Sequence, residues 1–177
     1  RAVSEPDEPD LYGRSKAAAE HVVLSAIREG RGSHLIVRTS WLYGRGGRNF
    51  VDTMAALGAR NEALTVVDDQ WGRPTLTDDL ARAAISLAHS ASPGIWHVAG
   101  QGVTTWCDFA REIVRLTHGR AVVEGVSSAE WGAAAPRPRR AVLGLGPTEA
   151  QLGHPLRHWR EALRSYLAEA VPARGSS

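Results

Sequence analysis

Residues 12–38, YGRSKAAAEHVVLSAIREGRGSHLIVR, carry the pattern that decides the fold. The part SKAAAEHVVLSAIRE is rich in alanine and has apolar residues at helical spacing, which predicts a helix. Gly30 and Gly32 then end that helix. The next residues, HLIVR at 34–38, form a short apolar run typical of a buried strand. A helix followed directly by a buried strand is the repeating unit of α/β proteins.

The same alternation continues to the end of the chain. Asn49 and Thr77 stand where helix N-caps are expected, and Thr105 with Asp108 resembles a capping box. Further helices are predicted at 49–60, 76–90, 104–119, 147–153 and 156–170, and further strands at 63–67, 94–100 and 120–126. The sequence therefore predicts an α/β fold with a largely parallel sheet.

Composition excludes several classes of protein. Hydrophobic residues make up 43% of the 177, which suits one globular domain or slightly more. The only cysteine, Cys107, allows no internal disulfide and is expected to be a small buried hydrophobe. No apolar run approaches a membrane span, and the basic residues do not cluster into a nucleic-acid-binding stripe. We expect a cytoplasmic protein that binds neither membrane nor nucleic acid.

Lys16 is the only lysine beside twenty arginines, and it follows Tyr12 by four residues. Residues four apart share one face of a helix, so the hydroxyl and the amine would converge. A nearby ammonium favours the phenolate and makes the tyrosine a useful proton donor or acceptor. A lysine ammonium can also donate hydrogen bonds to a ribose, with a geometry that an arginine fork does not reproduce. The alternative is an unremarkable pair on a solvated helix face.

Two loops that follow predicted strands contain polar and aromatic side chains suited to binding a ligand. In RTSWLYG at 38–44, hydroxyls come directly after a strand, where α/β sheets bind ligands. Trp41 can cover a sugar or base there, or it can be an ordinary packed tryptophan. The loop DQWGRPT at 69–75 can offer hydrogen bonds to a polar ligand, or it can be a plain connecting turn.

Two other motifs are rejected. YGRGGRN at 43–49 lacks the third glycine and the tight strand-to-turn spacing of a dinucleotide loop, so a loop capped by Asn49 is the better interpretation. His154 and His158 have helical spacing, but no third metal ligand is nearby and Pro155 intervenes.

Five segments follow one another before a terminal helix that contains a tryptophan: YGRSKAAAE, RTSWLYGRGGRNFVDTM, VVDDQWGRPTLTDDLARA, GIWHVAGQGVTTWCDFAREI and APRPRRAVLG. This ordered set resembles the dTDP-4-dehydrorhamnose reductase family of extended short-chain dehydrogenases/reductases, from about residue 4 to about 168. The resemblance implies NADPH-dependent (or NADH-dependent) reduction of dTDP-4-dehydro-L-rhamnose to dTDP-L-rhamnose. It also implies the C-terminal portion of a Rossmann-type fold with a small sugar-nucleotide-binding subdomain.

The resemblance assigns roles to particular residues. Tyr12 would be the proton donor and Lys16 the ribose anchor, with Thr39 and Ser40 at the nicotinamide end of the cofactor site. The sugar nucleotide would be bound by Trp41, Asn49, Gln70, Pro74 and Arg137.

The resemblance also implies a missing part. Enzymes of this family carry a glycine-rich turn and a further catalytic Ser or Thr upstream of the tyrosine, and this chain has neither. We therefore expect 1–68 to be a remnant of the dinucleotide-binding domain with the active-site helix. We expect 69–170 to be a mixed remainder, mainly the sugar-nucleotide-binding part with a returning Rossmann strand and helix, and 171–177 to be a tail. The isolated chain is expected neither to bind the cofactor nor to turn over substrate.

Other assignments stay open at this stage. Besides the dTDP-sugar, the expected partner is a missing N-terminal half or a second copy of the chain. One alternative function is a non-catalytic regulatory subunit resembling the beta subunit of methionine adenosyltransferase. Another is a reductase of a different dTDP-4-keto-deoxysugar.

Overall fold

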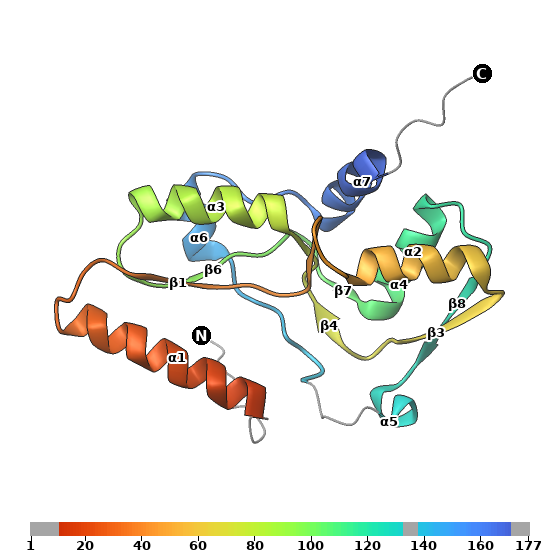
Figure 1. Cartoon of the computed structure of the whole chain (residues 1–177), viewed down its shortest axis with the longest axis horizontal. Helices are drawn as coiled ribbons and strands as arrows, with labels where there is room; N and C mark the ends of the chain where they lie inside the picture. The colour runs from red at the N-terminus through yellow and green to blue at the C-terminus, as the bar shows by residue number, and fades with distance from the viewer. Residues whose placement is uncertain (1–10, 133–137, 171–177) are drawn as a thin grey trace.

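Helices surround pairs of short strands in this α/β chain (Figure 1). The computed structural model describes residues 11–132 and 138–170. Its helices are α1 (Leu11–Arg28), α2 (Phe50–Arg60), α3 (Thr77–Ser90), α4 (Trp106–Leu116), α5 (Ser128–Trp131), α6 (Gly146–Leu152) and α7 (Trp159–Ala170). Its strands are β1 (Leu35–Arg38), β2 (Leu42–Tyr43), β3 (Ala63–Val67), β4 (Trp71–Gly72), β5 (Thr75–Leu76), β6 (Gly94–His97), β7 (Thr104–Thr105) and β8 (Val122–Val126).

The strands pair mostly in parallel, as the alternation of helices and strands predicts. The pairs β1·β6, β2·β5 and β3·β8 are parallel, and β4·β7 is antiparallel. Within the described ranges they remain four two-stranded pairs instead of one continuous sheet. The register of the first pair sets Arg38 opposite His97, so both strands end at the same level.

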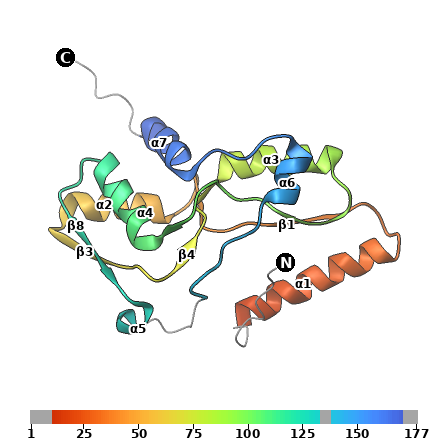
Figure 2. The ribbon, with the colours of Figure 1, turned by 180° about the vertical axis from the view of Figure 1, so that it is seen from behind.

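The largest core cluster joins α4 to α7 and to β2. Phe109 and Ile113 of α4 are buried there against Trp159, Leu163 and Tyr43. A second cluster packs the other side of α4 on β3 and β8 and includes Cys107, which is buried as expected. A third cluster packs α3 against β6. The core is thus built mainly around α3 and α4, and none of the described side chains of α1 belongs to these three clusters. Figure 2 shows α1 lying apart from α2, α4 and α7.

The structure shows which of the predicted N-cap residues cap their helices. The side chains of Asn49 and Thr105 accept from the backbone N–H groups of Asp52 and Asp108, which confirms both N-caps. The prediction for Thr77 is wrong, because the cap is Leu76 and no side chain bonds the first turn. Leu76 belongs to the largest core cluster, so tertiary packing decides this boundary instead of cap chemistry.

The described residues contain neither a candidate membrane-spanning helix nor a candidate metal-binding cluster. In the part of the chain that the structure describes, no helix has both the length and the apolar character needed to cross a membrane. In the same residues, no three His, Cys, Asp or Glu side chains come together as metal ligands.

Candidate functional site

The candidate site lies where β1 and β6 end. The backbone N–H of Val98, just after β6, donates to the carbonyl of Arg38 at 2.9 Å. The chain then continues from Arg38 into Thr39, Ser40 and Trp41, and from Val98 into Gly100. Because ligands of open α/β sheets bind at the carboxyl ends of the strands, these loops occupy the expected position for a ligand.

The loop 69–75 reaches the same place, although the sequence left open whether it is a ligand-binding loop or a plain turn. Ser40 Oγ donates to the carbonyl of Arg73 at 3.0 Å, and Thr75 N–H donates to the carbonyl of Trp41 at 3.1 Å. Gly100 N–H donates to Thr75 Oγ1 at 3.2 Å. Three loops that are distant in the sequence therefore meet around Ser40.

Arg73 fastens these loops with its side chain, a role that the sequence did not indicate. Its Nε donates to the carbonyl of Leu143 at 3.1 Å, and its Nη1 lies 3.3 Å from the carbonyl of Gly102. Burial lowers the pKa of the Arg73 guanidinium, while the negative charge of Glu149 opposes that shift. The half-buried guanidinium of Arg73 thus holds together the loops around Gly102 and Leu143, which are far from Arg73 in the sequence.

Trp41 adopts a backbone conformation that is unusual for a tryptophan. Its φ is +48°, in the left-handed region that bulky residues rarely enter. Its ring stacks on Trp106, with centroids 3.7 Å apart and planes 14° from parallel. Gly72 also packs so closely on this ring that a Cβ there would overlap the indole. Of the two roles open for Trp41, the structure shows the packed one directly.

Thr39 carries a buried hydroxyl for which the described residues provide no hydrogen-bond partner. Such groups are rare in folded proteins, because an unpaired buried hydroxyl costs about 1–3 kcal/mol. Tyr43, Trp159 and Thr148 also have unpartnered buried polar atoms, the first two in the largest core cluster and the third in α6. Thr39 instead directly follows β1, at the strand end where a ligand is expected.

Gln70 and Pro74 are buried within this arrangement. Gln70 Nε2 donates to Ser128 Oγ at 2.9 Å. The carbonyl of Trp71 accepts from Ala141 N–H at 3.0 Å, so Ala141, at the end of the sequence PRPRRA (136–141), lies beside this loop. Arg137 of that segment lies outside the described residues.

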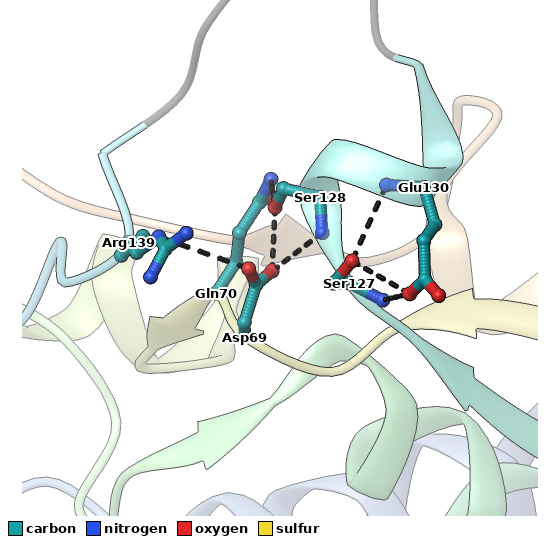
Figure 3. Close-up of polar contacts among 6 residues, drawn as sticks. All are labelled: Asp69, Gln70, Ser127, Ser128, Glu130 and Arg139. Carbon is teal, nitrogen blue, oxygen red and sulfur yellow. Dashed lines mark hydrogen bonds and ion pairs between the residues drawn. The ribbon is translucent and has the colours of Figure 1, made fainter.

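Asp69 holds α5 against this loop, as Figure 3 shows. Its Oδ1 accepts from both the N–H and the Oγ of Ser128, at 2.9 and 2.5 Å. These hydrogen bonds hold the pKa of Asp69 below its ordinary value. Ser127 and Glu130 form a capping box at the same helix end. The helix α5 was not predicted, although the sequence contains its S-x-x-E signature.

Lys16 and Tyr12 occupy α1, as predicted, in successive turns. The Lys16 side chain is exposed, whereas the Tyr12 side chain lies outside the described part of the chain. One further turn along, Glu20 accepts two hydrogen bonds from the guanidinium of Arg38, at 2.7 and 2.5 Å. This pair connects α1 to the residue immediately before Thr39.

Asn49 serves a different part of the structure. Its side chain caps α2 and donates to the carbonyl of Gly44 and to Tyr166 Oη, at 3.0 and 3.1 Å. The interpretation of 43–49 as a loop capped by Asn49 is therefore confirmed. These contacts are separate from those that gather the loops around Ser40.

Comparisons with known proteins show which family this chain resembles. The family model described as RmlD substrate binding domain matches residues 2–171. The chain is 42% identical over 167 residues to the spore coat polysaccharide biosynthesis protein SpsK of Bacillus subtilis, covering 94% of this chain and 57% of that protein. It is 42% identical over 169 residues to a dTDP-4-dehydrorhamnose reductase of Streptomyces griseus, covering 92% of this chain and 53% of the relative.

Solved structures give the same result. A dTDP-4-dehydrorhamnose reductase of Bacillus anthracis in complex with NADP superimposes with a TM-score of 0.83 at 36% identity, over 94% of this chain and 58% of that one. An orthologue from Clostridium acetobutylicum gives a TM-score of 0.84 at 36% identity, over 96% of this chain and 60% of that one. The chain thus spans between half and three-fifths of the length of these relatives. Because the match runs through nearly every described residue, the chain belongs to the RmlD substrate-binding-domain family.

Proposed function

We propose that the protein carrying this chain reduces the 4-keto group of dTDP-4-dehydro-L-rhamnose with NADPH and yields dTDP-L-rhamnose. The observation that carries the proposal is the meeting of three loops around Ser40, at the carboxyl ends of β1 and β6. Relatives of about 40% identity that are named as reductases of dTDP-4-keto sugars support the same chemistry.

The residues present fit a nicotinamide cofactor. The unpartnered hydroxyl of Thr39 is a buried polar group that a ligand amide or ribose can satisfy. Thr39, Ser40, Lys16 and Tyr12 would hold the cofactor, which supplies a hydride when it is bound. A relative of 36% identity was crystallised in complex with NADP.

The chain's own residues then perform the acid–base and positioning work. Tyr12 would give its phenolic proton to the C4 oxygen, and the Lys16 ammonium would favour the phenolate that remains. Trp41 would border the sugar with the edge of its ring that Trp106 and Gly72 leave open. Gln70 and Pro74, with Arg137 and Asn49, would contact the rest of the sugar nucleotide.

The domain division follows from these roles. Residues 1–68 would contribute the acid–base helix and the cofactor loop, and 69–170 mainly the sugar-nucleotide-binding part. The loop 69–75 links the two, because the carbonyl of Arg73 accepts from Ser40 while Thr75 donates to Trp41 and accepts from Gly100.

A second candidate substrate is another dTDP-4-keto-6-deoxysugar. A relative from Streptomyces niveus, named dTDP-4-keto-6-deoxy-D-glucose reductase, is 41% identical over 157 residues. That identity nearly equals the 42% of the Streptomyces griseus relative. The two substrates are distinguished by incubating the protein with each and determining the configuration at C4 of the product.

The test is NADPH oxidation by the natural protein in the presence of dTDP-4-dehydro-L-rhamnose. Tyr12→Phe should lower turnover by about 10²–10⁴-fold, the usual contribution of a general acid. Lys16→Arg should also impair turnover, because the planar fork cannot reproduce the amine position. Arg14→Gln is the matched control, since Arg14 is exposed on α1 but does not share the helical spacing of Tyr12 and Lys16. Full activity of either Tyr12→Phe or Lys16→Arg would refute these roles.

A further inference from the structure

We propose that Glu20 and Arg38 are positioning residues, which set the acid–base helix α1 against the loop 39–41. The inference rests on the proposed reductase function, and it assigns a role to two residues that the sequence did not single out. The structural basis is the ion pair between the middle of α1 and the last residue of β1.

The geometry of the pair is specific. Arg38 Nε donates to Glu20 Oε1 at 2.7 Å, and Arg38 Nη2 donates to Glu20 Oε2 at 2.5 Å. Two parallel bonds between a guanidinium fork and a carboxylate fix orientation as well as distance. A single point contact would let the helix rotate about its axis, whereas a two-point contact resists that rotation.

The position of Glu20 on α1 makes this restraint relevant to chemistry. Tyr12, Lys16 and Glu20 are spaced by four residues, so they follow one another along one side of the helix. Fixing Glu20 therefore fixes the rotational setting of the turns that carry Tyr12 and Lys16. The helix runs beside β1 in the opposite direction, which brings its first turns toward the end of that strand (Figure 2).

The other partner stands directly before the cofactor loop. Arg38 is followed by Thr39 and Ser40, and its carbonyl accepts from Val98 N–H at 2.9 Å. The backbone of Arg38 is thus held in the β1·β6 pair while its side chain reaches α1. One residue thereby connects the acid–base helix to the strand end that presents Thr39.

The surroundings favour an ionised pair. Hydrogen bonds from Arg38 hold the pKa of Glu20 below its ordinary value, and the charges of Arg38 and His97 act in the same direction. The Glu20 side chain is 22% exposed and that of Arg38 is 44% exposed, so solvent partly screens the attraction. The contribution of the pair to global stability should accordingly be small, and its main effect should be on the setting of α1.

The experiment compares the wild-type natural protein and three variants of it. Two are the single variants Glu20→Gln and Arg38→Gln, and the third is the charge swap, which carries Glu20→Arg and Arg38→Glu together. The first readout is backbone amide hydrogen exchange, which needs no cofactor or substrate. Exchange in 11–28 should rise about two- to fivefold in each single variant, as loss of a partly exposed pair predicts, with α4 unchanged. The swap should return α1 toward the wild-type rate.

The second readout is turnover with NADPH and the dTDP-sugar. Each single variant should lose about ten- to a hundredfold in kcat, because a displacement near 1 Å is enough for such a loss. The swap should recover a large part of it. Arg115→Gln is the matched control. Arg115 also makes a two-point pair, with Glu112 at 2.8 Å for both bonds, but inside a single helix, and its removal should leave α1 exchange and kcat unchanged.

The outcomes separate this inference from the proposed function. If wild-type protein turns over no dTDP-sugar while the single variants loosen α1, the reductase proposal fails and the link between α1 and β1 stands. If wild-type protein is active and the single variants keep full kcat and unchanged exchange, the positioning role is overturned. A charge swap that behaves no better than the single variants also overturns it.

Discussion

Replacing Gly72 with alanine should displace Trp41 and loosen the loop that carries it. A methyl group at Gly72 overlaps the indole of Trp41, which cannot withdraw because it stacks on Trp106 at 3.7 Å. Overpacking of this kind costs about 1–3 kcal/mol. In a domain of this size each kcal/mol lowers the melting temperature by about 2–4 °C, so we expect a decrease of roughly 2–12 °C.

Thermal unfolding followed by far-UV circular dichroism measures the decrease, and the near-UV spectrum reports on the stacked tryptophans. Gly47→Ala is the matched control, since a Cβ at Gly47 has no heavy atom within 4 Å and its φ is not positive. That variant should stay within about 0.5 kcal/mol of the wild type.

A double-mutant cycle identifies the cause. Trp41→Ala alone should destabilise the protein, because it removes the stacking on Trp106. Gly72→Ala added to Trp41→Ala should be nearly neutral, since the ring that the methyl group overlaps is gone. If Gly72→Ala proves as stable as Gly47→Ala, or equally damaging with and without Trp41, the packing argument is wrong.

Two further predictions concern local restraints. Thr105→Ala should lower the urea midpoint by an amount equivalent to about 1–2 kcal/mol, because Thr105 Oγ1 caps α4 and donates to Asp68 at 2.7 Å. Thr105→Ser keeps the hydroxyl and should largely preserve stability. An unchanged midpoint in the alanine variant would contradict this role. Asp69→Ala should destabilise the protein at neutral pH but not in acid. The pKa of Asp69 is lowered, mainly by hydrogen bonds from Ser128, so its contribution is complete above the unfolded-state value of about 4 and disappears as the pH falls through the folded-state value. Urea unfolding of both proteins between neutral and acidic pH measures the difference, and a gap that persists in strong acid would refute the assignment.

The elements of this fold were predictable where the signals are local. Helical periodicity, the glycines after α1 and the caps Asn49 and Thr105 all involve residues within a few positions of one another. Thr77 misled because the preceding residue, Leu76, is buried in the core, and no local rule reveals that burial. The short helix α5 was missed although its capping signal was readable.

The site was predictable only in outline. Parallel strands end at one edge, so the sequence could predict that Thr39 and Ser40 lie at a strand end, the place where open α/β sheets bind ligands. The role of Arg73 could not be predicted, because its acceptors Gly102 and Leu143 come from segments far along the chain. The packing of Trp41 depends in the same way on its distant partner Trp106.

The strain at Trp41 distinguishes this loop from the rest of the chain. Within the described residues, His118 is the other non-glycine residue with positive φ, and it follows the end of α4, where a left-handed residue is ordinary. Trp41 has no such local reason, and a conformation of this kind costs about 1–3 kcal/mol. The stacking on Trp106, the bond from Thr75 and the close fit to Gly72 together hold it there. The left-handed backbone of Trp41 is therefore set by contacts with residues distant in the sequence, and removing one of them should let this residue relax toward an ordinary φ.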